Sequence, residues 1–186
     1  MAKSPTSRRI LLGVLGALVL FYACLVGMRV LWPLRFEDVV LREAVARSLD
    51  ADLVGAVIYA ESRFDPDAVS PRGAIGLMQI MPETGTWIAS QLGLAEPAAQ
   101  DLFDVELNVR FGTWYLRYLL DRFDDTEAAL QAYNAGPANV DQWRDAGADP
   151  YPETVTYVRR VLTARPIYRF FFRFPGLIRI TPALSF

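Results

Sequence analysis

The chain has 186 residues, enough for one packed domain of ordinary size and about 30 to 50 residues more. Its apolar content of 53% is high for a wholly soluble protein, whereas 22% charged residues is too many for a protein that crosses a membrane repeatedly. One cysteine and no histidine exclude a disulfide framework, a Cys/His zinc site and any Ser-His or Cys-His catalytic pair. We therefore expect chemistry by carboxylates, hydroxyls or amides, with no metal ion and no cofactor.

The net charge of -2 conceals an uneven distribution of charge along the chain. The charged residues of segments 1–35 and 159–186 are all basic. Residues 36–158 hold all 21 acidic residues and have a net charge of -13. An acidic main domain argues against nucleic acid as its partner. The basic ends allow both termini to lie near an anionic surface.

The first feature in chain order is an uncharged apolar run at residues 10–28. A helix of this length spans roughly 28 Å, about the hydrocarbon thickness of a bilayer. Lys3, Arg8 and Arg9 precede the run, which favours a cytoplasmic N-terminus. We expect residues 1–9 to be cytoplasmic, residues 10–32 to cross the bacterial inner membrane once, and the remainder to lie in the periplasm.

The apolar run could instead belong to a cleaved signal peptide or precede a lipid-modified cysteine. A cleaved signal peptide has a shorter apolar region of about 7 to 15 residues, and no Ala-x-Ala site occurs before Pro33. Cys24 could be a lipid-modified cysteine, but the preceding Phe-Tyr-Ala does not resemble the usual Leu-small-small sequence. An apolar residue inside a retained helix is the simpler interpretation of Cys24.

The central region, residues 36–165, is dominated by helical periods of three and four, and no convincing alternating strand occurs in it. These features predict an all-α domain, with residues 62–76 as a structured loop rich in turn signals. The expected helices cover residues 37–48, residues 51–60 with Asp50 or Asp52 as the cap, a helix opened by Pro82 and ended by Gly93, a long helix begun by Asp104, residues 126–134 closed by Gly136, and a last helix opened by Pro152 with Tyr157, Val158, Val161 and Leu162 as apolar positions.

Glu61 extends the apolar stripe of the second of these helices, which runs from Val54 through Ile58. A carboxylate on a core face is poorly hydrated, so its pKa should rise and the group should hold a proton near neutrality, as a general acid must. The alternative is that Glu61 turns to solvent or pairs with Arg63 or Arg72. Periodicity alone favours that alternative.

The loop after Glu61 places two glycines and the amide of Gln79 beside an apolar run. Glycine lets the main chain approach a ligand closely, and an amide offers a donor and an acceptor together. Taken alone, a glycine-rich loop is most often only a turn.

Four short motifs follow one another in this region. They are Glu61-Ser62-x-Phe64, Ser70-Pro71-x-Gly73-Ala74-x-Gly76-Leu77-Met78-Gln79-x-Met81-Pro82, Ala132-Tyr133-Asn134-Ala135-Gly136, and Pro152-Glu153-Thr154 with Tyr157-Val158. In this order they resemble the motifs of bacterial lytic transglycosylases with the soluble-lytic-transglycosylase catalytic domain, relatives of goose-type lysozyme. The resemblance covers about residues 45 to 165 and implies a lysozyme-like helical fold for a catalytic domain at residues 36–165.

The resemblance also implies roles for individual residues. Glu61 matches the family's sole catalytic acid/base, and Met78 would form an apolar floor beneath a sugar ring. Glu153 resembles the glutamate of a Glu-Thr-Arg motif, but Val155 stands where the arginine is expected, which leaves the polar partner of Glu153 undefined. The remaining residues implied to line the sugar cleft are Ser70, Gln79, Tyr133 and Asn134.

The implied activity is cleavage of the β-1,4 bond between N-acetylmuramic acid and N-acetylglucosamine in peptidoglycan, with formation of 1,6-anhydro ends. Ordinary glycosidases need two carboxylates, and the nearby candidates, Asp65 and Asp67, lie in a turn that such residues usually stabilise. One acid suffices if the sugar supplies its own nucleophile. The alternatives are a hydrolytic muramidase and a noncatalytic peptidoglycan-binding protein.

Aromatic residues outside these motifs give weaker signals. Trp87, Trp114, Tyr115 and Tyr118 have helical spacings that favour the core. Residues 166–186 form a basic aromatic tail that either lies in the headgroup region of a membrane or closes the core with its rings while its arginines face water.

Overall fold

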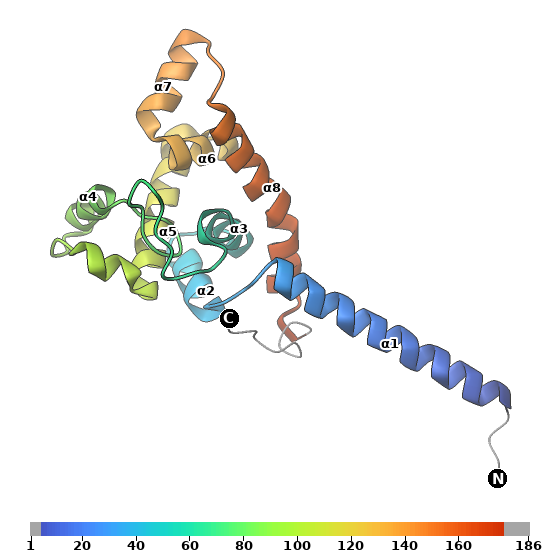
Figure 1. The fold of residues 1–186 in the computed structure, drawn as a ribbon. Helices are drawn as coiled ribbons and strands as arrows, with labels where there is room; N and C mark the ends of the chain where they lie inside the picture. The colour runs from blue at the N-terminus through green and yellow to red at the C-terminus, as the bar shows by residue number, and fades with distance from the viewer. Residues whose placement is uncertain (1–4, 177–186) are drawn as a thin grey trace.

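The computed structural model describes residues 5–176. Within this range no strand is present, and the β-type pairing is limited to isolated bridges of Ile75 with Val69 and Ile80. The expected all-α fold is therefore confirmed (Figure 1). Its elements are α1 (Pro5–Leu31), α2 (Glu37–Ala46), α3 (Ala51–Ser62), α4 (Pro82–Leu92), the 3-10 helix η1 (Ala99–Phe103), α5 (Val105–Phe123), α6 (Thr126–Ala135), α7 (Pro137–Ala146) and α8 (Pro152–Arg173).

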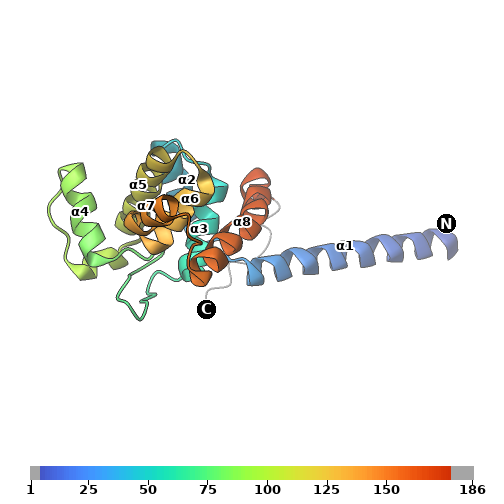
Figure 2. The ribbon, with the colours of Figure 1, turned by 90° about the horizontal axis from the view of Figure 1, so that it is seen from above.

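Helix α1 projects away from the other helices, on the side opposite α4 (Figures 1 and 2). Its segment Arg8–Leu31 is long and apolar enough to cross a membrane, and most of its side chains are exposed in the isolated chain. Met28, in the last turn of α1, and Trp32 just after it pack against the domain core. The sequence thus forms one long apolar helix whose C-terminal end is fixed to the folded domain.

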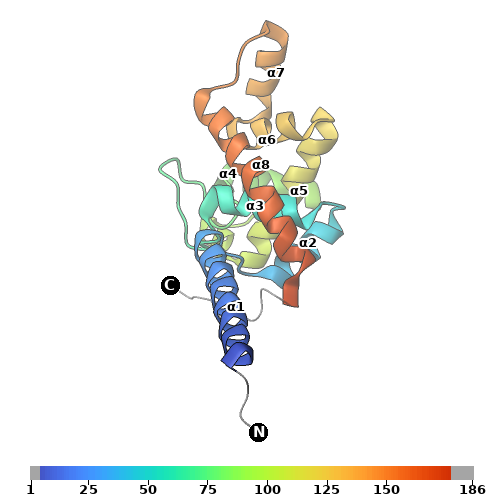
Figure 3. The same cartoon turned by 90° about the vertical axis from the view of Figure 1, so that its right-hand side faces the viewer.

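Helix α3 lies at the centre of the domain and packs mainly against α8, and also against α2 (Figures 1 and 3). Most of its residues are buried, as its near-continuous apolar sequence requires. Gly55 permits the close approach of α8, because a Cβ atom there would lie 3.0 Å from Cδ1 of Tyr168. Burial of α3 on all sides is what makes the carboxylate at its C-terminal end chemically unusual.

Several predicted helix ends are confirmed by their caps. Asp104 and Asp125 each accept a main-chain N–H hydrogen bond at 2.8 Å from the first turn of α5 and α6. Gly93 ends α4 in the left-handed conformation, with φ 65°. Asp50, one of the two residues expected to cap α3, occupies its N-cap position, and its side chain forms no capping hydrogen bond.

Three features of the helices were not predicted. Helix α7 and the 3-10 helix η1 fall in stretches for which we expected no helix, and α8 continues through Pro166 to Arg173. Leu162, predicted as an apolar inward position, is 40% exposed. Short helices such as α7 are hard to predict, because few of its residues face the core and its periodic signal is weak.

The basic aromatic tail is described only to residue 176. Tyr168 and Phe171 are fully buried in the core, whereas Arg169 and Arg173 are exposed. The described part of the tail therefore closes the core with two of its rings. Residues 177–186 lie outside the described residues.

Candidate active site

Glu61 lies in the last turn of α3, next to the loop of residues 63–81. The helix ends there because Arg63 and Phe64 both adopt positive φ angles, 54° and 65°. Phe64 is fully buried and stacks on Tyr168 of α8, with ring centroids 5.6 Å apart. This anchored turn fixes the position of Glu61 at the C-terminal end of α3.

The Glu61 side chain lines a hollow of about 540 Å³, which is bounded by α3, the loop and α8. Glu61 is the one carboxylate among its described lining residues, so a pair of carboxylates is not available there. Asp65 and Asp67, the weaker candidates for a second acid, are exposed in the turn and do not line this hollow. The polar lining residues are Tyr59, Glu61, Ser62, Arg63, Ser70, Gln79 and Arg160.

The pKa of Glu61 is raised to about 7 because burial removes water from its carboxylate. The hydroxyl of Tyr157 and the positive charge of Arg160 lower this pKa in part. Arg160 donates a hydrogen bond to the carbonyl of Ala60 at 3.2 Å and forms no salt bridge with Glu61 within residues 5–176. Near neutral pH Glu61 therefore exists in both protonation states, as a group that gives and takes back one proton must.

Two tyrosine hydroxyls accompany Glu61 from different helices. Tyr133 of α6 donates a hydrogen bond to the carbonyl of Met78 at 2.9 Å. The hydroxyl of Tyr157 in α8 is buried beside Glu61 and has no hydrogen-bond partner of good geometry. Burial, with the negative charge of Glu61 as a smaller cause, raises the pKa of both phenols well above the ordinary value, so both stay neutral. In the sequence Tyr157 was an apolar position of the last helix and part of the fourth motif, and neither signal indicated that its hydroxyl lies beside Glu61.

The loop brings Ser70 and Gln79 to the hollow. The Gln79 amide donates to the carbonyls of Ala68 at 3.1 Å and Gly76 at 2.8 Å, and Gln79 itself adopts a φ of 49°. Ser70 Oγ accepts a hydrogen bond from the Ala74 N–H at 3.0 Å. The Gln79 carbonyl oxygen and the Ser70 O–H have no hydrogen bond among the described residues and can meet a ligand.

Asn108, which we did not single out from the sequence, holds this loop from beneath. It is buried in α5, accepts the Met78 N–H at 2.7 Å, and donates to the carbonyls of Ile75 at 2.9 Å and Leu102 at 2.7 Å. Gly76, with φ 77°, is required next to it, because a Cβ there would collide with the Asn108 amide. A single polar residue inside a helix gave no signal that distinguished it from a surface residue.

The hollow that contains Glu61 is not lined by the remaining predicted site residues, Met78, Asn134 and Glu153. The Met78 side chain is fully buried against Gly112 and does not line the hollow, while its main-chain carbonyl accepts the hydrogen bond from the Tyr133 hydroxyl. Asn134 is exposed at the end of α6, and Glu153 is exposed in the first turn of α8. Neither side chain forms a hydrogen bond or a salt bridge with another described residue.

A second hollow, of about 270 Å³, is lined by residues of α4 and α5 and by Pro137 of α7. The ring of Tyr133 lies 5.5 Å from that of Tyr115, one of its lining residues. The aromatic residues that we expected in the core are thus only partly buried, and three of them form an open surface. Helical spacing alone could not distinguish an aromatic residue in the core from one on an open surface. The lining consists of Glu83, Thr84, Trp87, Tyr115, Tyr118 and Pro137.

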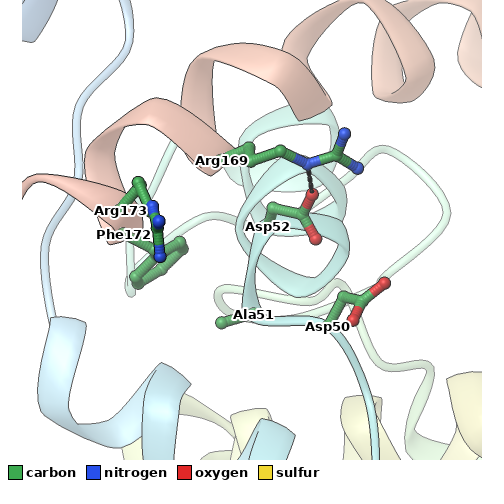
Figure 4. Close-up of a pocket in the computed structure, with 6 residues that line it drawn as sticks. All are labelled: Asp50, Ala51, Asp52, Arg169, Phe172 and Arg173. Atoms are coloured by element: carbon green, nitrogen blue, oxygen red, sulfur yellow. Dashed lines mark hydrogen bonds and ion pairs between the residues drawn. The ribbon is translucent and has the colours of Figure 1, made fainter.

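A third hollow, at the N-terminus of α3, also contains carboxylates but has a different character (Figure 4). Asp52 there is 7% exposed and pairs with Arg169 at 2.7 Å, and Arg165 pairs with Asp50 at 2.7 Å. These ion pairs join α3 to α8 and neutralise the acids, which is a structural role. Nowhere in residues 5–176 does a group of three or more Asp, Glu or Cys side chains have the arrangement of a metal site.

The sequence of this chain is similar to those of known proteins. The family model described as "Transglycosylase SLT domain" matches residues 38–152. The soluble lytic murein transglycosylase of Escherichia coli K12 is 34% identical over 155 residues, covering 75% of this chain and 24% of that protein. Membrane-bound lytic murein transglycosylase F of Desulfosudis oleivorans is 39% identical over 119 residues, covering 60% of this chain and 24% of that protein.

Solved structures give the same result. The 70 kDa soluble lytic transglycosylase of Escherichia coli matches with a TM-score of 0.72 and 33% identity, covering 78% of this chain and 26% of that one. An inactive mutant of the lytic transglycosylase Slt from Pseudomonas aeruginosa matches with a TM-score of 0.73 and 31% identity over the same shares. This chain therefore spans about a quarter of the length of these relatives.

Proposed function

The chain belongs to the Transglycosylase SLT domain family, and on this premise we propose that it is a lytic transglycosylase that cleaves the β-1,4 bond between N-acetylmuramic acid and N-acetylglucosamine in peptidoglycan. The observation that carries the proposal is Glu61, whose pKa is raised to about 7 and which is the one carboxylate among the described residues of its hollow. A lone acid of this kind suits a reaction in which the sugar provides the nucleophile.

In the proposed reaction, protonated Glu61 gives its proton to the glycosidic oxygen, and the bond from C1 to that oxygen breaks. The ionised Glu61 then takes the proton from the C6 hydroxyl of the muramyl sugar, whose oxygen bonds to C1. The product is a 1,6-anhydro sugar, and no water is consumed. A pKa near 7 suits both steps, because the same group must act as acid and then as base.

The neighbouring groups would orient the sugar for this closure. The free donor of Ser70 and the free acceptor of Gln79 face the hollow that contains Glu61, and the neutral hydroxyl of Tyr157 is buried beside Glu61. Holding C6 close to C1 can contribute several kcal/mol. Tyr133 would hold the loop through its hydrogen bond to the Met78 carbonyl. We place Asn134 and Glu153 at the exposed rim as substrate contacts, and Met78 as support through its main chain.

We further propose that the aromatic hollow continues the glycan-binding cleft. Its faces of Trp87, Tyr115 and Tyr118 suit the apolar faces of sugar rings. Tyr133, whose ring lies 5.5 Å from that of Tyr115, is also close enough to Glu61 for the charge of Glu61 to raise its pKa. A glycan strand could thus lie across both hollows.

We propose that α1 anchors the protein in the inner membrane of a bacterium. The length and apolar character of Arg8–Leu31 support this assignment, and the basic residues before it support a cytoplasmic N-terminus. In this arrangement residues 1–9 are cytoplasmic, residues 10–32 cross the membrane, and the catalytic domain of residues 36–165 acts in the periplasm. Carbonate extraction and protease protection of the full chain in cells test the anchor and its direction.

The reaction is tested by incubating the full chain, purified in a nonionic detergent, with purified peptidoglycan and analysing the released fragments by mass spectrometry. We expect 1,6-anhydro ends, which are lighter by one water than hydrolytic products. Glu61→Gln should abolish release, whereas the matched control Asp67→Asn, an exposed carboxylate in the adjacent turn, should not. Reducing ends would identify a hydrolytic muramidase, and activity retained by Glu61→Gln would refute the catalytic assignment.

A further inference from the structure

A hollow at the junction of α1 and the domain has a strongly basic lining that the proposed reaction does not use. Its volume is about 300 Å³. It contains three arginines from three separate segments and one acid, Asp65. The lining residues are Arg29, Val30, Pro33, Arg35, Arg63, Phe64 and Asp65.

The arginines of this hollow are not neutralised by ion pairs. Within residues 5–176, no salt bridge involves Arg29, Arg35 or Arg63. The Nη1 atom of Arg29 is buried and has no hydrogen-bond partner, although Glu37 lies close enough to attract its charge. A buried guanidinium N–H without an acceptor is costly, and an anion that binds there removes the cost.

The fold holds two of the three side chains before any ligand arrives. The guanidinium of Arg35 lies 5.1 Å from the centroid of the Phe36 ring, and that of Arg63 lies 5.7 Å from that of Tyr59. The intervening linker is fixed because the Tyr168 hydroxyl donates to the carbonyl of Pro33 at 2.8 Å. Several preorganised guanidinium groups around one space are the usual chemistry for binding a phosphate group.

The position of the hollow identifies the source of that phosphate. Arg29 and Val30 belong to the last turn of α1, and Arg29 is only about 3 Å along the helix axis from its end at Leu31. If α1 crosses the membrane as proposed, the hollow opens at the depth of the lipid headgroups. We propose that Arg29, Arg35 and Arg63 bind the phosphate of an anionic phospholipid. This inference rests on the proposed anchor role of α1 and does not depend on the proposed reaction.

Binding of a lipid there would also orient the catalytic domain. Arg63 lines both this hollow and the Glu61 hollow, so the two sites share a wall. A headgroup held by Arg63 fixes the end of α3 relative to the membrane surface. The catalytic hollow would then meet glycan strands that run close to the membrane.

The test is native mass spectrometry of the full chain in nonionic detergent, titrated with phosphatidylglycerol, phosphatidylcholine or inorganic phosphate. We expect one phosphatidylglycerol to bind more tightly than phosphatidylcholine, because the choline cation is repelled by the arginines. The double variant Arg35→Gln/Arg63→Gln should weaken phosphatidylglycerol binding roughly 25-fold, or about fivefold for each charge. The control Arg110→Gln/Arg159→Gln removes the same charge from exposed arginines without ion pairs and should leave binding unchanged.

A second variant covers the case in which the double variant folds poorly. Asp65→Asn removes the one acid of the hollow and can still accept the Asp67 N–H, which Asp65 Oδ1 accepts at 3.0 Å. It should tighten phosphatidylglycerol binding severalfold, which a folding defect cannot do.

Equal weakening in both double variants, or no change in Asp65→Asn, would overturn the site. Displacement of phosphatidylglycerol by millimolar inorganic phosphate would overturn the lipid assignment in favour of a free anion. Because lipid binding is measured without peptidoglycan, failure here is distinct from failure of the proposed reaction, and carbonate extraction tests the anchor separately.

Discussion

The Tyr133 hydroxyl donates a hydrogen bond at 2.9 Å to the main-chain carbonyl of Met78, 55 residues earlier in the sequence. The N–H of Met78 is held at the same time by Asn108, at 2.7 Å. The peptide groups that flank Met78 are therefore tied to both α6 and α5. This pair of bonds fixes the loop beside Glu61 and holds Tyr133, whose ring lies 5.5 Å from that of Tyr115 in the lining of the aromatic hollow.

The rate of cleavage should fall as the pH rises through about 7. The first step needs Glu61 protonated, and burial raises its pKa to about 7. We expect kcat/KM to have an alkaline limb with a midpoint near that value, measured by release of soluble fragments from peptidoglycan across about pH 3.5 to 9. A limb that falls near pH 4.5, the ordinary value for a glutamate, would contradict the role of burial.

The stability of the protein should show the same ionisation. Because the folded-state pKa of Glu61 lies above the unfolded value, its contribution is fully present below about pH 4.5 and is lost as the pH rises through about 7. The loss amounts to at most about 3 kcal/mol, reduced by solvent that reaches the hollow. Denaturant unfolding of Glu61→Gln should therefore lack this decline between pH 4.5 and 7, and an unchanged pH profile would count against it.

Tyr157→Phe should move the alkaline limb of activity to higher pH. The Tyr157 hydroxyl lowers the pKa of Glu61, so its removal lets the pKa rise further. Since this buried hydroxyl has no other partner, the free energy of unfolding should change by less than about 1 kcal/mol. The pH profile separates this electrostatic role from simple packing, because packing loss would lower the rate at every pH and leave the midpoint where it was.

Trp87→Ala should weaken cleavage of long glycan strands more than that of short ones. Trp87 lines the aromatic hollow next to Tyr115 and Tyr118, away from Glu61. Loss of its ring face should raise KM for long strands by about fivefold to tenfold, which corresponds to about 1 kcal/mol of aromatic contact. Trp114→Ala is the matched control, because Trp114 stacks on Tyr118 but does not line the hollow. Equal effects of both variants at every strand length would argue against a glycan-binding role.

Gly112→Ala should reduce stability and activity together. The new Cβ would meet the Met78 side chain, so Met78 must move and its carbonyl would shift away from Tyr133. Such overpacking usually costs about 1 to 3 kcal/mol, measurable as a lower denaturation midpoint. At the buried helical Gly85 the nearest atom to the new Cβ is Leu102 Cδ2 at 3.2 Å, so Gly85→Ala should cost less and spare activity. The opposite order would show that the Met78 loop is free to adjust.

Much of the site was accessible from local patterns. The apolar stripe that ends in Glu61 allowed a desolvated carboxylate, but periodicity alone favoured a Glu61 that faces solvent or pairs with an arginine. The family motifs favoured the catalytic alternative, and burial in the structure raises the pKa of Glu61 to about 7. The pattern could not show that Tyr157, about a hundred residues later, supplies the neighbouring hydroxyl. It also could not show that Asp52 pairs with Arg169 of α8 across the domain.

The sequence by itself determined the features that arise from neighbours along the chain: one long apolar helix, the caps at Asp104 and Gly93, the all-helical class and the family motifs. The tertiary structure alone decided which side chains from separate helices meet. The reason is physical, since helical period and capping depend on residues within a few turns. The pKa of Glu61, the contact of Tyr133 with Met78 and the three-arginine hollow depend on packing between segments far apart in the chain.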